Sequence, residues 1–174
     1  MFRKTFLATA VALIAGVSFQ ASAAETSSTF QVTATVASSC AIVGAANLDF
    51  GAYDPAVANA TADKTASTSG IQVRCNGGTT AIVNIDEGLN KLAGSTCAAP
   101  VRAMIDGSGN KMNYTIGTAA NLSRSVIGCS SPTNLPLTFA RLETQTVGLF
   151  GAIPAAQNVP VGSYSDTLTV KVTF

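Results

Sequence analysis

The cysteines are the residues of this 174-residue chain whose type and spacing suggest chemistry most directly. There are four of them, Cys40, Cys75, Cys97 and Cys129, and an even number indicates disulfides in an exported protein. Of the three pairings that are possible, we favour the sequential one, Cys40–Cys75 with Cys97–Cys129. Each bridge then closes a loop of about 35 residues and stabilises the fold by ~3–4 kcal/mol. Zinc is the alternative, but the chain has no histidine and no C-x-x-C pair.

The remaining polar residues form no recognisable catalytic constellation, because a chain without histidine has no Ser-His-Asp or Cys-His arrangement. Asp86 and Glu87 are adjacent, and neighbours on a strand point to opposite faces, so we interpret them as solvated turn residues. The run from Asp106 to Asn110 resembles a calcium loop but lacks the downstream glutamate, which favours a hairpin turn. Tyr114 and Tyr164 are interpreted as packing residues at strand ends rather than sugar-binding platforms. We therefore expect no enzyme, no cofactor, no metal site and no small-molecule substrate.

Residues 1–23 have the three parts of a secretory signal peptide. Arg3 and Lys4 give a positive start, an apolar run extends from Leu7 to Val17, and Ala21-Ser22-Ala23 is a small-x-small cleavage site. The apolar run is shorter than the roughly 20 residues that a membrane-spanning helix needs, so an uncleaved anchor is the weaker alternative. The mature protein is expected to begin near Ala24 and to be soluble.

Charge argues against nucleic acid or anionic lipid as a partner. The chain has 10 basic and 9 acidic residues, and removal of Arg3 and Lys4 leaves 10 − 2 = 8 basic residues against 9 acidic ones. A chain that is nearly neutral has no field to attract polyanions. The 174 − 23 = 151 residues that remain are enough for one domain with one core.

Apolar and polar residues alternate along most of the chain, which is the period of β-strands. The expected strands are Phe30–Val36, Ala41–Phe50 (as a bent strand or a pair), Ile71–Cys75, Ala81–Ile85, Val101–Ile105, Lys111–Ile116, Leu135–Phe139, Val147–Ile153 and Tyr164–Phe174. The segment from Ala52 to Ser69 is interpreted as a loop or a weak edge. Short strands separated by Gly and Asn turns, without a helical period or a repeat, predict an all-β sandwich or barrel.

The two ends of the mature chain carry complementary strand patterns. The last predicted strand reaches Phe174, and an alternating segment from Thr29 to Val36 precedes the first cysteine. This N-terminal segment has two interpretations: an ordinary first strand of its own sheet, or a strand that completes the sheet of another molecule.

The chain resembles the spore coat protein U domain family, which includes subunits of archaic, Csu-type chaperone–usher pili. The resemblance covers essentially the whole mature chain. The residues that carry it are Thr29 to Val36 ahead of Ser39-Cys40, Leu48-Asp49-Phe50-Gly51, Ile71 to Cys75, Asn113-Tyr114, Gly151 to Pro154, Val159 to Val170, and Val172-Thr173-Phe174.

The resemblance implies an incomplete immunoglobulin-like β-sandwich that lacks its seventh strand and is completed by donor-strand complementation. Residues 24–38 would then be an N-terminal donor-strand extension, and residues 39–174 a pilin-type domain. The implied donor residues are Phe30, Val32, Ala34 and Val36. The implied edge of the acceptor groove consists of Leu168, Val170, Val172 and Phe174. The Cys40–Cys75 bridge fits the family, whereas Cys97–Cys129 rests on pairing arithmetic alone.

The function implied is that of a structural pilus subunit, exported through the periplasm to a cell-surface fimbrium that supports adhesion and biofilm formation. Its partners would be neighbouring pilin subunits in a homopolymer, a periplasmic chaperone and an outer-membrane usher. Two alternatives from the same family stay open: a secreted spore-coat or matrix protein, and a minor tip adhesin.

Overall fold

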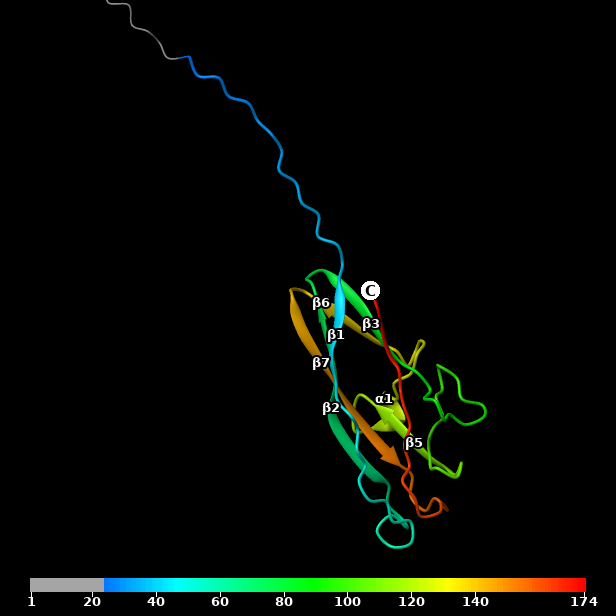
Figure 1. Ribbon diagram of the computed structural model, residues 1–174. Coiled ribbons are helices and arrows are strands. Elements are labelled where there is room, and N and C mark those ends of the chain that lie inside the picture. Colours follow the sequence, from blue (N-terminus) through cyan, green and yellow to red (C-terminus); the bar gives the residue numbers. More distant parts are fainter. Residues whose placement is uncertain (1–23) are drawn as a thin grey trace, which may run out of the picture. The chain divides into compact units, whose positions relative to one another are not determined.

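The computed structural model describes residues 24–174, and the predicted signal peptide, residues 1–23, lies outside the described residues (Figure 1). The strands are β1 Cys40–Ala45, β2 Lys64–Cys75, β3 Thr79–Ile85, β4 Arg102–Ile105, β5 Lys111–Gly117, β6 Leu135–Phe139, β7 Glu143–Ile153 and β8 Val170–Thr173, with one short helix, α1 Leu122–Ser125. The chain forms two units, residues 1–35 and residues 36–174. No helix among residues 24–174 is long and apolar enough to cross a membrane.

The described part of the first unit, residues 24–35, has no helix or strand, and every residue in it is exposed. The same holds for residues 36–38 at the start of the second unit. In this structure Thr29 to Val36 form no strand of the chain's own sheets.

The second unit consists of two antiparallel sheets. The larger one has five strands in the order β1-β2-β7-β5-β4, and the smaller one has three in the order β6-β3-β8. Alternating residues of β2, β3 and β7 are buried, as the period of two in the sequence predicts. Apolar side chains from both sheets, among them Val73 of β2, Val83 of β3 and Phe139 of β6, form one core cluster. The fold is therefore all-β.

The turn between β4 and β5 follows the predicted chemistry. The β4–β5 hairpin closes over Asp106, whose Oδ1 accepts hydrogen bonds from the backbone N–H groups of Ser108 and Asn110 at 2.9 and 2.8 Å. Gly109 has a φ of 89°, the left-handed conformation that a glycine adopts without strain. The segment from Asp106 to Asn110 is therefore a hairpin turn, in agreement with the sequence analysis.

The structure corrects several predicted strand boundaries, among them the start of β7, which lies at Glu143 rather than at Val147. Lys64–Ser69 is not a loop but the first half of β2, paired with β7 from Lys64↔Ile153 to Thr68↔Leu149. Gly70, with a φ of 73°, lies at the bulge between the two halves of β2. The predicted strand Ala41–Phe50 ends at Ala45, and the predicted strand Tyr164–Phe174 is reduced to β8 plus an isolated bridge between Ser165 and Ile105.

Both disulfides have the sequential pairing that the sequence analysis favoured. Cys40 and Cys75 are direct partners in the β1–β2 ladder, with Cα atoms 4.2 Å apart. Cys97 and Cys129 connect the segment between β3 and β4 to the segment between α1 and β6, with Cα atoms 4.7 Å apart. The described residues include no free cysteine.

Candidate functional site

An open groove in the domain lies between the segment that follows β1 and the segment that precedes β8. β1 is one of the two outer strands of the five-stranded sheet, and β8 is one of the two outer strands of the three-stranded sheet. Neither edge strand has a second neighbour in its sheet. An edge of this kind presents backbone N–H and C=O groups that another strand can pair with.

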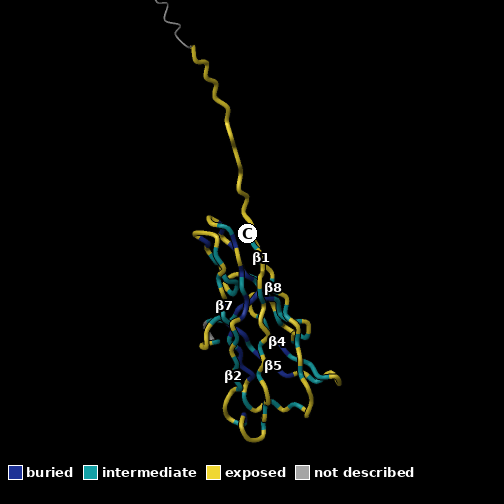
Figure 2. The backbone as a smooth tube through the Cα atoms, turned by 60° about the vertical axis from the view of Figure 1, so that its left-hand side comes forward, coloured by how far each residue is buried: buried dark blue, intermediate teal, exposed yellow. Residues whose placement is uncertain are grey.

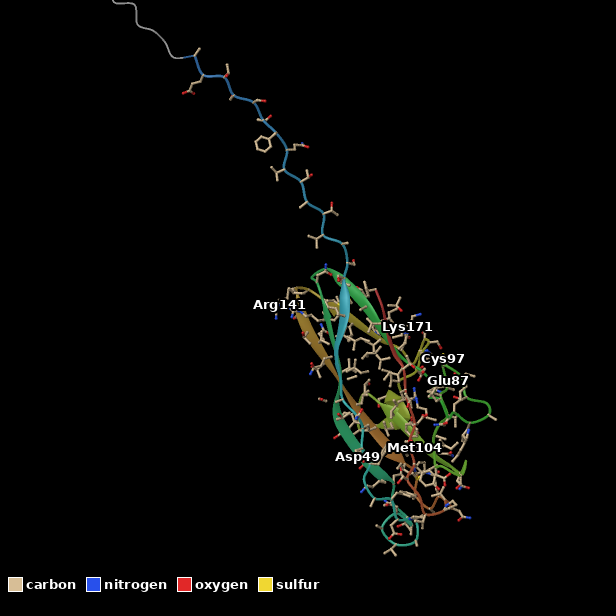
Figure 3. The ribbon with its side chains drawn as sticks, viewed as in Figure 1. Asp49, Glu87, Cys97, Met104, Arg141 and Lys171 are labelled. Carbon is tan, nitrogen blue, oxygen red and sulfur yellow. A yellow bond between two sulfur atoms is a disulfide. The ribbon has the colours of Figure 1, made fainter. Side chains whose placement is uncertain are left out.

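The groove is lined by residues that a closed sandwich would cover. It consists of two adjoining hollows of about 480 and 750 Å³, which share Leu48, Phe50, Met104 and Tyr164 as lining residues. One wall is the segment from Ala45 to Phe50, which follows β1, and the other is the segment from Tyr164 to Val170. The floor of the smaller hollow is the core itself, with Ile71, Ile85, Ile116 and Leu149. The core is therefore open along this line, and Met104, labelled in Figure 3, belongs to both hollows.

The C-terminal wall is paired along one side only. Ser165 exchanges two backbone hydrogen bonds with Ile105, and the carbonyls of Thr167 and Thr169 accept from the N–H groups of Leu89 and Asp86. Within residues 24–174, the alternate residues Asp166 and Leu168 make no backbone–backbone hydrogen bond. Since backbone polar groups that stay unpaired in an apolar setting are costly, this side of the wall is suited to receive a strand.

A hydrogen-bonded carboxylate holds this wall in place. The Tyr114 hydroxyl donates to Asp166 Oδ2 at 2.7 Å, while Asn90 donates to Asp166 Oδ1 from Nδ2 at 3.0 Å and from its backbone N–H at 3.2 Å. Burial, followed by the contact with Asp166, raises the pKa of Tyr114 far above its ordinary value, so the phenol stays a neutral donor. The Tyr114 ring also meets Phe50 edge to face, with centroids 6.2 Å apart. Tyr114 is thus a packing residue, as expected, and it also fixes the groove.

Arg102 is a structural residue that the sequence analysis did not single out. It is 1% exposed, at the start of β4. Its Nε and Nη2 donate to the Asp86 carbonyl at 3.0 and 2.6 Å, and Nη2 also donates to the carbonyls of Ile85 and Ile127 at 3.3 and 2.9 Å. Burial lowers the pKa of this guanidinium, but arginine stays charged in proteins, so it acts as a buried cation bound by carbonyl oxygens.

Asp86 and Glu87 are partly buried and bonded, which corrects their interpretation as solvated turn residues. Asp86 Oδ1 accepts from the backbone N–H groups of Gly88 and Thr169, both at 3.0 Å, so it helps to hold the C-terminal wall. Glu87 accepts from Lys91 Nζ at 2.6 Å, and this hydrogen bond lowers the pKa of Glu87. Glu87 is therefore bonded within the segment between β3 and β4, whereas Asp86 connects that segment to the C-terminal one.

Two of the four predicted acceptor residues lie in the C-terminal wall, and Val172 and Phe174 line neither hollow. Leu168 and Val170 line the smaller hollow, and Val172 is half-buried against the core. Phe174 is 55% exposed and lines neither hollow. The opposite wall, Ala45 to Phe50, was not predicted as part of the site. The motif Leu48-Asp49-Phe50-Gly51, which the sequence analysis quoted only for the family resemblance, is the signal that could have identified this segment.

The predicted donor residues are exposed on their segment. Phe30 is 86% exposed, Val32 and Val36 are each 85% exposed, and Ala34 is exposed as well. Figure 2 shows this stretch in the colour of exposed residues throughout. Full burial of a large apolar side chain contributes ~1.5–3 kcal/mol of favourable free energy, so binding to an apolar surface would stabilise this segment.

The matches with known proteins include a family, a relative and a solved structure. The spore coat protein U domain matches residues 26–171 of this chain. Protein U of Myxococcus xanthus is 35% identical over 178 residues, which cover 98% of each chain. A chain in the crystal structure of the CsuC–CsuE chaperone–tip adhesion subunit pre-assembly complex, from the archaic chaperone–usher Csu pili of Acinetobacter baumannii, superposes with a TM-score of 0.53 at 24% identity.

The structural match covers 80% of this chain, which spans 40% of the length of the matched chain. The likeness concerns the fold, and it confirms the prediction of an all-β, immunoglobulin-like architecture. The predicted family is confirmed as well.

Proposed function

The chain belongs to the spore coat protein U domain family, and from this premise we propose that it is a structural pilus subunit that polymerises by donor-strand exchange. The observation that carries the proposal is the open groove between the segments Ala45–Phe50 and Tyr164–Val170, in a chain that also has an exposed, alternating segment at residues 29–36. A groove that lacks one strand and a segment with the pattern of one strand are complementary parts.

The energetics support an exchange between molecules. Burial of Phe30, Val32 and Val36 at ~1.5–3 kcal/mol each, with a smaller gain from Ala34, contributes ~4–10 kcal/mol. Backbone pairing with the unpaired groups of Asp166 and Leu168 adds directional hydrogen bonds, in the recognition mode called β-strand addition. Together these contributions favour a noncovalent link between subunits, against the cost of ordering the segment on binding.

The proposal includes helper proteins, because an exposed groove lined by core residues is prone to aggregate before assembly. A periplasmic chaperone occupies the groove of the exported subunit, and an outer-membrane usher exchanges it for the N-terminal segment of the next subunit. The similar Csu structure is a pre-assembly complex of a subunit with a chaperone, which supports a chaperone-bound stage for the present chain. The product is an extracellular fimbrium on the cell surface that serves adhesion and biofilm formation.

A second candidate function is that of a spore-coat or matrix protein. It is favoured by the description of the family and by the 35% identity to Protein U. In this alternative the groove receives a strand within a coat layer rather than along a fibre, so electron microscopy of the cell surface distinguishes the two.

The test is deletion of residues 24–36 in cells that also produce the chaperone and the usher of the same organism. The truncated subunit is expected to fold with the chaperone and to form no fibres, since the groove is intact and the donor is missing. A matched variant, Gln31→Ala with Thr33→Ala, keeps the apolar face and is expected to assemble. Fibres of normal length from the truncated subunit would show that the segment is not the donor.

A further inference from the structure

Asn76, the first residue after β2, holds the backbone just before β1 begins. Its Nδ2 donates to the carbonyl of Ala37 at 2.6 Å, and its Oδ1 accepts from the backbone N–H of Ser39 at 2.9 Å. Its own backbone N–H donates to the carbonyl of Ser39 at 3.1 Å. The hydroxyl of Thr79, a residue only 3% exposed, donates to the same Oδ1 at 2.6 Å. A buried hydroxyl therefore orients the Asn76 amide, which in turn fixes Ala37 and Ser39.

These bonds extend the alignment of β1 on β2 beyond the first strand residue. The ladder begins with Cys40 opposite Cys75, a pair that is also joined by a disulfide. Ser39 lies opposite Asn76, one position further out, and Ala37 is bonded to the same side chain. The chain from Ala37 to Cys40 is thus held against the end of β2 and enters β1 without changing direction.

Insertion of residues 29–36 into the groove of their own domain requires a reversal of the chain. The groove runs beside the continuation of β1, so a segment that precedes β1 reaches it only by turning back between Val36 and Cys40. The linker available for this turn is Ala37-Ser38-Ser39, and tight hairpin turns favour Gly, Asn or Asp at positive φ. Among the described residues other than glycine, Ala156 alone has a positive φ, so the linker does not adopt such a turn.

We propose that Asn76, by holding Ala37 and Ser39 against the end of β2, prevents the turn that residues 29–36 need to enter the chain's own groove, so that the occupant of each groove is the segment of a second copy. The inference rests on the proposed function. It adds the residue that determines whether a groove is filled by the segment of another molecule or by the segment of the same molecule. Asn76 acts as a positioning residue, because its contacts are with the linker and not with the groove.

The experiment compares wild type with two variants of the exported chain, by size-exclusion chromatography with light scattering over a dilution series. Asn76→Ala removes both side-chain bonds to the linker, whereas Asn76→Asp keeps the acceptor for Ser39 and Thr79 and loses the donor to Ala37. Asn158→Ala is the matched control, since Asn158 is exposed and remote in sequence from the linker. A further variant, with about five Gly and Ser residues inserted after Val36, supplies a loop of a length that permits reversal.

In wild type and Asn158→Ala, we expect assemblies that depend on concentration and monomers whose residues 29–36 exchange amide hydrogens freely. In Asn76→Ala and in the insertion variant, the ratio of stable monomer to assembly is expected to rise by about tenfold, the factor for the loss of one to two hydrogen bonds at ~1 kcal/mol each. Residues 29–36 are expected to be protected from exchange in that monomer. Asn76→Asp is expected to lie between the two and serves as the comparison if Asn76→Ala does not fold.

The possible failures are distinguishable. If Asn76→Ala and Asn76→Asp match wild type in both measurements while deletion of residues 24–36 abolishes assembly, the role of Asn76 is refuted and donor exchange is not. If the deletion leaves assembly unchanged, the proposed function fails, and the role of Asn76 fails with it.

Discussion

Replacement of Arg102 by methionine tests the network that supports the groove. Methionine keeps much of the side-chain volume but donates no hydrogen bond, so the carbonyls of Ile85, Asp86 and Ile127 lose the four bonds that Arg102 provides. Ile85 and Ile127 are each 1% exposed, and a buried acceptor without a partner costs ~1–3 kcal/mol. Relief of the desolvation of the guanidinium offsets part of this cost, which leaves an expected loss of about 2–4 kcal/mol.

The assay is guanidinium unfolding of the purified protein, with wild type and variants in the same state of assembly. Arg74→Ala is the matched control, because Arg74 is exposed and a surface substitution changes stability by within about 0.5 kcal/mol. Arg102→Met is also expected to weaken assembly, since β4 contacts the C-terminal wall through Ile105 and Ser165. Equal midpoints for Arg102→Met and wild type would refute the reasoning that this buried cation stabilises the fold through its carbonyl partners.

Three further predictions concern the segment, the backbone and the cysteines. Phe30→Asp is expected to block incorporation into fibres, because the carboxylate would enter an apolar groove at a cost of several kcal/mol. Gln31→Asp is the control and should assemble. Normal fibres from Phe30→Asp would indicate another register of the segment. Gly70→Ala is expected to lower the free energy of unfolding by more than ~2 kcal/mol, measured by thermal unfolding, since Gly70 has a φ of 73° and an added Cβ meets the Val147 carbonyl. Gly107→Ala is the control, because a Cβ at Gly107 has open space, and its stability should be close to that of wild type. Reduction of both disulfides is expected to lower the melting temperature markedly, and detection of free thiols in the native protein by mass spectrometry would contradict their presence.

The local features of the fold could be predicted from the sequence because local residues determine them. The hairpin from Arg102 to Gly117 follows from strong alternation on both sides of a Gly-containing turn. In contrast, Lys64–Ser69 consists of small and hydroxyl side chains, and its strand exists because β7 pairs with it. The segment has no alternation of large apolar and polar residues that would predict such a strand.

The groove was only partly predictable for a related reason. Leu168 and Val170 alternate with polar residues, and both line the smaller hollow, although the regular strand begins only at Val170. The regular strand is shorter than expected because β3 pairs with this segment only from Val170 to Thr173. Arg102 was missed because its partners are backbone carbonyls from two distant segments. The pattern of side chains near Arg102 in the sequence does not indicate that these carbonyls lie beside it.

The Cys40–Cys75 bridge also determines how the domain carries mechanical load. A pull on the N-terminal segment enters the domain at the first residue of β1, an edge strand that hydrogen bonds alone would allow to peel from its neighbour. The covalent bond passes this tension directly to β2, whose ladder with β7 extends from Lys64 to Cys75 and is the longest in the domain. Traction along a chain of subunits would therefore act on the central strands of each domain in shear, rather than unzip its edge.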